Sequence, residues 1–189
     1  MPILLLSGGV ESATLLHEER RSEDLRALFI DYGQRAARPE RAAAVALCEA
    51  TSTPLTILSL RGLGKALAPP GAWRPHVPLP ARNLLAVSVA ANYALALKAR
   101  GVLVGLQRDD RGHREGAQPF IAALADTLAA LGLELETPYR NLSKAGVVAR
   151  GRALGVDYAA TYSCLLGRRV PCGRCPQCRS RAQALAFSP

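Results

Sequence analysis

The sequence has no hydrophobic run long enough to cross a membrane. Of its 189 residues 49% are hydrophobic, but no apolar run reaches the roughly 18 residues that a membrane-spanning helix needs. It also shows no charged leader with a cleavage site, because an apolar run begins at Pro2, directly after Met1. We therefore expect a cytoplasmic protein with no membrane contact.

Two further absences narrow the classes of ligand. The chain lacks a Walker A loop, because Gly62–Ala66 places Ala rather than Ser or Thr after its Lys. It also lacks a basic block or a separate RNA-binding domain, since the arginines behind its net charge of +9 are spread along the chain. That charge suits either a solvated Arg-rich surface or attraction to anions such as ATP. We do not expect tRNA as a partner.

What the sequence does contain is an alternation of short apolar runs with helical patterns. Strands are predicted at 2–6, 25–31, 54–60, 102–105 and 133–137, and helices at 39–50, 84–100, 119–131 and 141–154. Strand–helix–strand alternation produces parallel crossovers. The fold class is therefore α/β, with a three-layer, open, mostly parallel sheet.

One long connection is predicted between these elements. Residues 61–80 are rich in Gly and Pro and show no apolar periodicity, so we expect a surface loop. Trp73 and His76 lie in it. A lone Trp in such a loop is usually a packing anchor and a lone His usually faces solvent, so neither is assigned to the site.

The turn after the first strand is the strongest functional signal. Ser7-Gly8-Gly9-Val10-Glu11-Ser12 places two glycines and two serines where a strand passes into a helix. Glycines let a ligand approach the backbone, and the free amides and dipole of a helix N-terminus attract phosphate. Glu11 adds a carboxylate that could hold Mg²⁺ against the same phosphates. A plain Gly turn capped by Ser is the alternative.

Other polar residues follow the strands or begin helices. Tyr32 and Gln34 come just after the second predicted strand, at the edge where open parallel sheets bind ligands. Arg82, beside the expected helix cap Asn83, and Lys144, after Ser143, would oppose the helix dipole unless an anion is bound. We predict that Arg82 and Lys144 contact an anionic ligand; an ordinary turn and a solvated Lys are the alternatives.

Five cysteines divide into one and four. Cys48 lies in an apolar helical stretch and is predicted to be a core residue. The other four have the spacing C-x7-C-x2-C-x2-C and are Cys164, Cys172, Cys175 and Cys178. Without an export signal this predicts a metal site rather than disulfides, and four thiolates form a closed, structural zinc site. An iron–sulfur cluster is the alternative.

Several segments together resemble one family. The loop at 7–12 is similar to the SGGxDS loop of PP-loop (N-type) ATP pyrophosphatases, with Glu11 in place of Asp. In order, the chain also has Asp31-Tyr32-Gly33-Gln34, Pro80-Ala81-Arg82-Asn83, Leu142-Ser143-Lys144 and the Thr161–Cys178 cysteine frame. These motifs, spread over nearly the whole chain, resemble the 7-cyano-7-deazaguanine (preQ0) synthase family, QueC or ExsB.

The resemblance implies an adenine nucleotide alpha hydrolase-like (PP-loop) domain over residues 1–160 and a zinc-binding segment over residues 161–189 packed on it. It implies an ATP-dependent ligase that adenylates 7-carboxy-7-deazaguanine and, with ammonia, forms an amide and then a nitrile. The catalytic residues would be Ser12, Arg82 and Lys144, with ATP and Mg²⁺ bound by Ser7, Gly8, Gly9, Glu11, Ser12, Tyr32, Gln34 and Asn83. Family members often pair, which would give a homodimer.

One segment departs from the family. Where the family carries D-x-S-G-Y-P-D-C-R, which helps to recognise the deazaguanine, this chain has Asp109–Ala117, so that Glu115, Gly116 and Ala117 replace Asp, Cys and Arg. The competing readings are a ligase for another acid or amine, a PP-loop tRNA sulfurtransferase, and a nucleotide-binding paralogue without turnover.

Overall fold

A five-stranded parallel sheet forms the centre of the molecule. The computed structural model describes residues 1–20, 24–67 and 79–187. Its strands are β1 (Pro2–Leu5), β2 (Arg26–Asp31), β3 (Leu55–Ser59), β4 (Gly101–Val104) and β5 (Glu134–Glu136). All neighbouring strands pair in parallel, in the order β3-β2-β1-β4-β5.

This strand order creates a switch point between β1 and β4. The chain builds β1, β2 and β3 outward in one direction and adds β4 and β5 on the other side of β1. The loops that leave the carboxyl ends of β1 and β4 therefore diverge, and open parallel sheets bind their ligands in that crevice. Residues 7–12 leave β1 at this point.

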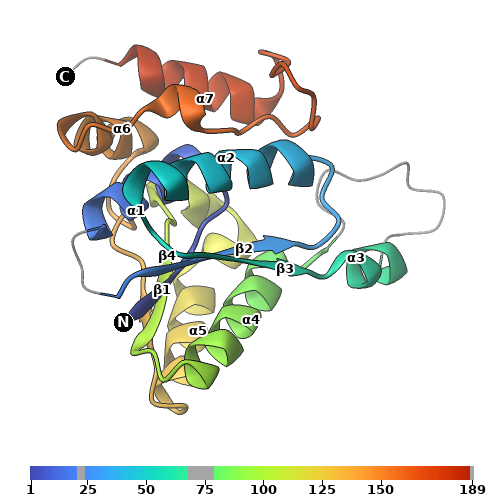
Figure 1. Ribbon diagram of the computed structural model, residues 1–189, viewed down its shortest axis with the longest axis vertical. Coiled ribbons are helices and arrows are strands. Elements are labelled where there is room, and N and C mark those ends of the chain that lie inside the picture. The colour runs from blue at the N-terminus through green and yellow to red at the C-terminus, as the bar shows by residue number, and fades with distance from the viewer. Residues whose placement is uncertain (21–23, 68–78, 188–189) are drawn as a thin grey trace.

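Helices cover both faces of the sheet (Figure 1). On one face lie α1 (Val10–Glu19), α2 (Ala37–Thr51) and α6 (Lys144–Ala153), and on the other α4 (Arg82–Ala96) and α5 (Gln118–Ala129). Each face has its own apolar core: Leu15, Leu16 and Val147 are fully buried on the first, and Val102 and Ala94 on the second. The three-layer parallel fold predicted from the sequence is confirmed.

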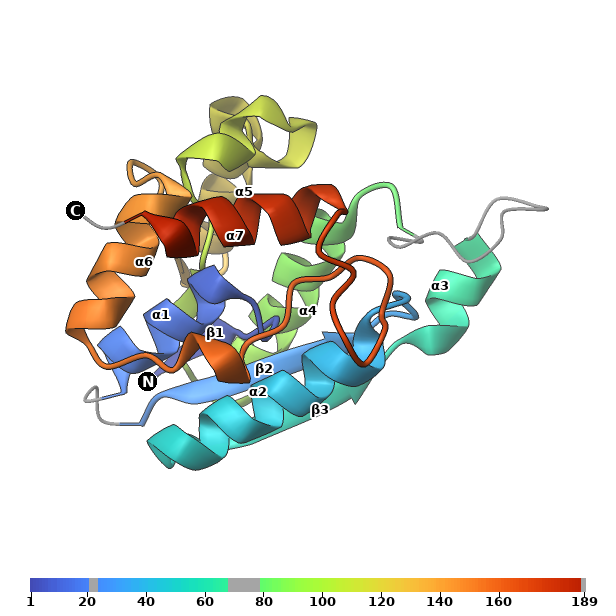
Figure 2. The ribbon, with the colours of Figure 1, turned by 90° about the horizontal axis from the view of Figure 1, so that it is seen from above.

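A further helix lies outside the first face. α7 (Pro176–Ala186) crosses over α6, and its Ala184 joins the core cluster beneath it (Figures 1 and 2). Thr161 and Tyr158 accept hydrogen bonds from the Arg181 guanidinium, which ties the helix down. The sequence predicted no helix here, because the segment is too polar to show an amphipathic pattern.

The predicted loop over residues 61–80 was wrong at its start. Residues Arg61–Leu67 form helix α3, which the Gly-rich composition concealed. Pairing between Arg61 Nε and Asp31 Oδ2 at 2.7 Å holds its first residue to the end of β2. Trp73 and His76 lie outside the described residues.

The remaining predicted elements agree with the structure within a few residues. Cys48 is buried in the core, where burial raises the pKa of its thiol to about 11. The part of the chain that the structure describes also contains short 3₁₀ turns at Arg108–Gly112, Arg114–Gly116 and Tyr158–Ala160. Among the described residues, every helix is too short or too polar to span a bilayer.

Candidate active site

The loop at 7–12 has a backbone that only glycine permits. Gly8 has a φ of +76°, in the left-handed region, and a Cβ built there would lie 2.6 Å from the carbonyl oxygen of Glu40. Any side chain at this position would be strained and would collide with α2. The loop is therefore held tightly against α2, with the first amides of α1 at its end.

Two serine hydroxyls face each other across this loop. Ser7 Oγ and Ser12 Oγ lie 3.1 Å apart, and the amide of Gly9 donates to Ser7 Oγ at 3.3 Å. No side chain caps α1, whose N-cap residue is Gly9. The amides at this helix start are thus left without a side-chain partner, as a phosphate site requires.

Lys144 reaches the loop from α6. Its Nζ lies 3.0 Å from Glu11 Oε1, and its side chain is only 9% exposed. Ser143 caps α6 by accepting from the Gly146 amide at 3.2 Å, as predicted. The solvated reading of Lys144 is wrong: the structure buries this cation against the loop.

A second polar group lies at the end of β2. Gln34 is buried; its Oε1 accepts from the Tyr32 amide at 3.0 Å, and its Nε2 donates to Glu40 Oε2, also at 3.0 Å. Burial raises the pKa of Tyr32, whose ring side chain also interacts with Arg82. Tyr32, Gln34 and Arg82 are therefore brought together, with Glu40 beside them.

Arg82 is the first residue of α4, two positions earlier than predicted, so Asn83 is not the helix cap. Glu115 fills that role from a distant turn: its Oε1 accepts from the amides of Asn83 at 2.9 Å and Leu84 at 3.2 Å. A carboxylate of the chain itself thus lies at this helix start, and the contact of Arg82 with an anionic ligand stays a prediction.

A cleft of about 230 Å³ opens beside this helix start. Its lining includes Arg82, Asn83, Asp110, His113 and Glu115. The contacts do not join Arg82 to Lys144 directly, but Asp110 connects the two regions, because it lines the cleft and its pKa responds to the charges of Glu11 and Lys144. Burial is the main cause that raises the pKa of Asp110.

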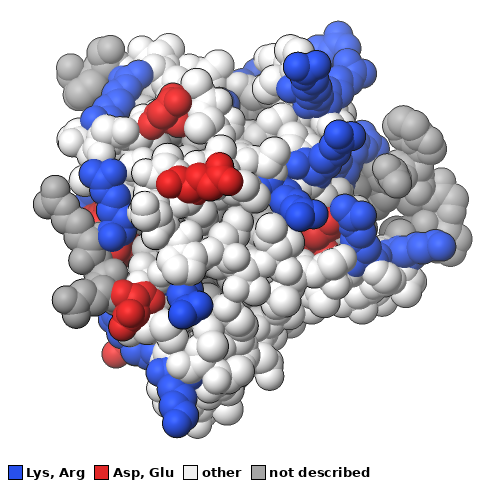
Figure 3. Space-filling view, in the orientation of Figure 1, with Lys and Arg blue, Asp and Glu red and all other residues white. Residues whose placement is uncertain are grey.

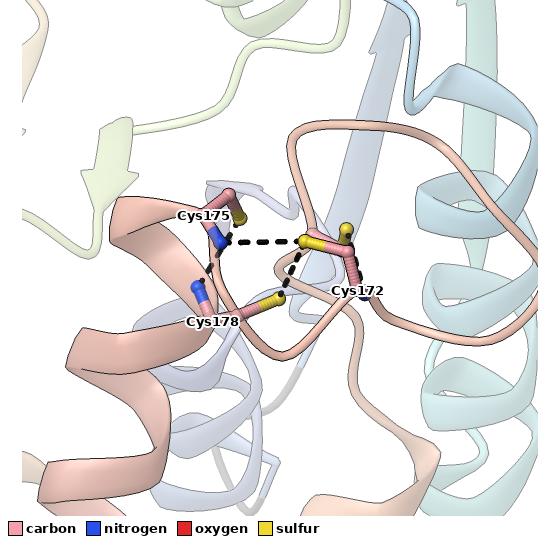
Figure 4. Close-up of side chains that lie close together, drawn as sticks. Cys172, Cys175 and Cys178 are labelled. Atoms are coloured by element: carbon pink, nitrogen blue, oxygen red, sulfur yellow. Dashed lines mark hydrogen bonds between the residues drawn. The ribbon is translucent and has the colours of Figure 1, made fainter.

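The four C-terminal cysteines meet at the start of α7, and Figure 4 shows three of them, Cys172, Cys175 and Cys178. All four sulfur atoms lie within 4.8 Å of one another, and Cys172 Sγ and Cys178 Sγ are 4.0 Å apart. A tetrahedral zinc site with bonds of about 2.3 Å places its sulfurs about 3.8 Å apart. The cluster therefore fits a single four-coordinate ion, and the structure brings the four cysteines together where the sequence predicted a metal site.

Backbone amides already favour the thiolate form at one of these cysteines. The amides of Arg174 and Cys175 lower the pKa of Cys172 to about 6. The Cys175 sulfur caps α7 by accepting from the Cys178 amide at 3.4 Å. Cys175 thus belongs both to the cysteine cluster and to the N-cap of α7.

This cluster is in contact with the loop at 7–12. The Tyr162 amide donates to the Gly8 carbonyl at 2.8 Å, and Tyr162 packs with Cys164 and Cys178 against Ala36 and Ala43 of the α2 region. Figure 2 shows the segment before α7 lying over the start of α2. The cysteine cluster therefore packs against the loop at 7–12 and helps to hold it in place.

Three carboxylates near the site received no role from the sequence: Glu40, Asp110 and Glu115. Asp110 and Glu115 follow β4, and position after a parallel strand was the signal that could have identified them. Glu40 lies in the first turn of helix α2, so its position in the sequence gave no such signal.

Comparison with known proteins gives a consistent result. The family model described as "Queuosine biosynthesis protein QueC" matches residues 1–188. 7-Cyano-7-deazaguanine synthase 1 of Sulfurisphaera tokodaii is 30% identical over 183 residues, which is 96% of this chain and 91% of that protein. The 7-cyano-7-deazaguanine synthase of Caldicellulosiruptor bescii is 31% identical over 202 residues, covering 96% and 90%.

Solved structures share the fold at lower identity. The U34-tRNA thiolase NcsA from Methanococcus maripaludis, with its [4Fe-4S] cluster, superposes with a TM-score of 0.60 and 18% identity, over 96% of this chain and 62% of that one. The NH3-dependent NAD synthetase from Campylobacter jejuni also gives 0.60, at 19% identity, over 84% and 65%. At these identities the likeness shows a PP-loop-type fold alone.

Proposed function

Because this chain belongs to the QueC family, we propose that it is an ATP-dependent carbon–nitrogen ligase that converts 7-carboxy-7-deazaguanine, or a closely related acid, into its amide and nitrile. The single observation that carries the proposal is the meeting of Lys144, Glu11, Ser7 and Ser12 at the start of α1, on the switch point of the sheet.

The chemistry explains why such a site is needed. A carboxylate resists attack by ammonia because its leaving group would be oxide, whereas AMP leaves readily from an acyl adenylate. The protein must therefore bind ATP with its α-phosphate near the acid and stabilise the pyrophosphate that departs. This is a task of positioning and of charge stabilisation, and needs no covalent intermediate with the protein.

The residues divide this task among them. Under the proposal, the Gly8–Gly9 backbone and the hydroxyls of Ser7 and Ser12 bind the pyrophosphate. Lys144 has three N–H donors and Glu11 engages one, so the amine can meet a phosphate oxygen while the ion pair persists. Arg82 supplies a second cation, and Tyr32, Gln34 and Asn83 border the nucleotide.

Two ions belong to the proposal. Mg²⁺ would be held by Glu11 and the phosphates and would neutralise charge on the departing pyrophosphate. Zn²⁺ is the ion that we propose for the four cysteines, where a closed site has a structural role. The substrates would be the small-molecule acid, ATP and ammonia; a homodimer is part of the same proposal, whereas tRNA and membranes are not.

The test is a product assay. Purified protein with ATP, Mg²⁺, ammonium and 7-carboxy-7-deazaguanine is expected to release pyrophosphate and to form the amide and the nitrile, detected by mass spectrometry. Release with a different acid would retain the ligase and change the substrate. Nucleotide binding without pyrophosphate release from any acid would indicate a paralogue without turnover, and the proposal would then be wrong.

A further inference from the structure

Glu40 differs from the other carboxylates around the site. It lies in the first turn of α2, and its carbonyl oxygen abuts Gly8 of the phosphate-binding loop. Its carboxylate is only partly exposed, and it accepts a hydrogen bond from a neutral amide, Gln34 Nε2, at 3.0 Å. Among the described residues, no Lys, Arg or His nitrogen lies within 4.0 Å of it.

Each neighbouring carboxylate, in contrast, already has a strong partner. Glu11 is paired with Lys144 at 3.0 Å and Asp31 with Arg61 at 2.7 Å. Asp110 accepts from the Gln107 amide at 2.8 Å, and Glu115 caps α4. Glu11 and Asp31 are thus neutralised by cations, and Asp110 and Glu115 bind backbone amides at helix starts. Glu40 has neither kind of partner among the described residues, because its hydrogen bond comes from the Gln34 side chain, so it is the carboxylate of this group that we expect to accept a proton during turnover.

The proposed reaction needs a proton acceptor. At neutral pH the nitrogen donor is mostly ammonium, which has no lone pair and cannot attack. We infer that Glu40 binds ammonium beside the phosphate-binding loop and takes the proton that converts it into the attacking ammonia. This inference rests on the proposed function and adds a role that the ATP-binding residues do not provide.

The step balances as follows. Ammonium transfers one proton to the Glu40 carboxylate and becomes ammonia. The nitrogen lone pair attacks the carbonyl carbon of the acyl adenylate, and a C–N bond forms as the C–O bond to AMP breaks. The nitrogen then loses a second proton to solvent, leaving a neutral amide, AMP and protonated Glu40.

The surroundings of Glu40 favour this transfer. Burial raises the pKa of its carboxyl group, which makes it a better base than an exposed glutamate. The ionisable groups facing it are Arg82 of α4, Asp31 and Tyr32 at the end of β2, and Tyr162 before the cysteine cluster. The nearby Arg82 cation disfavours ammonium relative to neutral ammonia, so it promotes loss of the proton.

A nucleophile that is already deprotonated provides the decisive test. Hydroxylamine is largely neutral at neutral pH and traps acyl adenylates as hydroxamates, so it needs no base. We expect Glu40→Gln to lower the ammonium-dependent rate about 100-fold, within the range of general base catalysis. Hydroxamate formation and ATP–pyrophosphate exchange with the acid should change by less than about threefold, a range we set for intact positioning.

Glu49→Gln is the matched control, because Glu49 is an exposed glutamate on the same helix. An ammonium-dependent rate of Glu40→Gln equal to that of Glu49→Gln would overturn the inference. An equal fall with both nucleophiles would also overturn it, because Glu40 would then be a structural residue. If the unaltered protein itself made neither hydroxamate nor amide, the proposed function would fail instead.

Thermal stability separates a base from a structural partner. Because burial raises the pKa of Glu40, its ionisation destabilises the folded state at pH values above that pKa. Below the pKa of glutamate in the unfolded chain, the group is protonated in both states and has no such effect on stability. Glu40→Gln should therefore raise the melting temperature near about pH 8 and leave it unchanged near about pH 4. A variant destabilised at both pH values would indicate a structural role and contradict the inference.

Discussion

At the scale of single residues, the site depends on charges that are buried together. Lys144 Nζ and Glu11 Oε1 meet at 3.0 Å, with side-chain exposures of 9% and 19%. Removing one partner from a buried pair leaves the other without compensation, and this costs more than the pair contributes. The same two residues are the ones proposed to meet phosphate and Mg²⁺, so stability and catalysis are coupled here.

We predict that Lys144→Ala and Ser12→Ala each lower pyrophosphate release at least about 100-fold, because each removes a donor aimed at the departing charge. Circular dichroism should show an intact fold in both variants. Lys144→Ala alone is expected to lower the melting temperature, since it leaves Glu11 unpaired. Rates near those of the unaltered protein in both variants would contradict the site assignment.

At the scale of secondary structure elements, the periodicity of hydrophobic residues predicted most of the helices and strands. β1 to β5 and α1, α2, α4, α5 and α6 follow from alternation of apolar runs and from caps such as Ser143. α3 and α7 were missed because neither has an amphipathic pattern: tertiary contacts hold them, through Arg61 to Asp31 and Arg181 to Thr161. Contacts between distant segments leave no periodic signal.

The same limit explains what the sequence did not reveal about the site. Residues 7–12 could be located because a strand-to-helix turn is a local feature. The cap on α4 could not be located, because Glu115 lies 32 and 31 positions along the chain from Asn83 and Leu84. The sequence indicated that an anion belongs near this helix start, but it could not identify Glu115 as the acceptor of the helix amides.

This arrangement predicts an effect of Glu115 on α4. Glu115→Ala leaves the amides of Asn83 and Leu84 without their acceptor, so unfolding free energy should fall by about 1 kcal/mol, as for loss of a helix cap. Because Arg82 begins this helix and is proposed to contact the phosphates of ATP, the KM for ATP should rise as well. Chemical denaturation and steady-state kinetics measure the two effects, with Glu134→Ala, on β5 and away from the cleft, as the control.

At the scale of the whole molecule, the chain carries a net charge of +9, and part of this positive charge lies together on the face shown in Figure 3. After Asp157 the chain contains five Arg residues and no Asp or Glu. Figure 3 shows Lys and Arg side chains concentrated on the right of that view, over the region that holds α3, the start of α2 and the loop before α7. Residues scattered along the sequence thus converge in space, beside the loop proposed to bind ATP.

We expect this charge to assist the binding of anionic substrates at long range. Salt screens such attraction, with a Debye length of about 8 Å at physiological ionic strength. The KM for ATP should therefore rise with added salt while kcat changes little, and a combined Arg168→Gln and Arg169→Gln variant, which removes two exposed charges, should weaken the dependence. Arg26→Gln, exposed at the opposite ends of the strands, serves as the control.

The cysteine cluster lies between the C-terminal segment and the loop at 7–12, so loss of the ion proposed for it should affect both. The segment that holds the four cysteines also contains Tyr162, which packs against Cys164. The Tyr162 amide lies 2.8 Å from the Gly8 carbonyl, so this segment is in direct contact with the loop. Zinc binding to the folded chain contributes folding free energy directly. Cys175→Ser should therefore lower zinc content and melting temperature and, because the loop loses its support, also weaken ATP binding.

Cys48→Ser provides the comparison: it disturbs a buried thiol of the core but should retain one zinc per chain and normal ATP affinity. Metal analysis, thermal denaturation and nucleotide titration measure the three effects, and a stable, zinc-free Cys175→Ser protein with unchanged ATP affinity would show that the metal site does not support the loop.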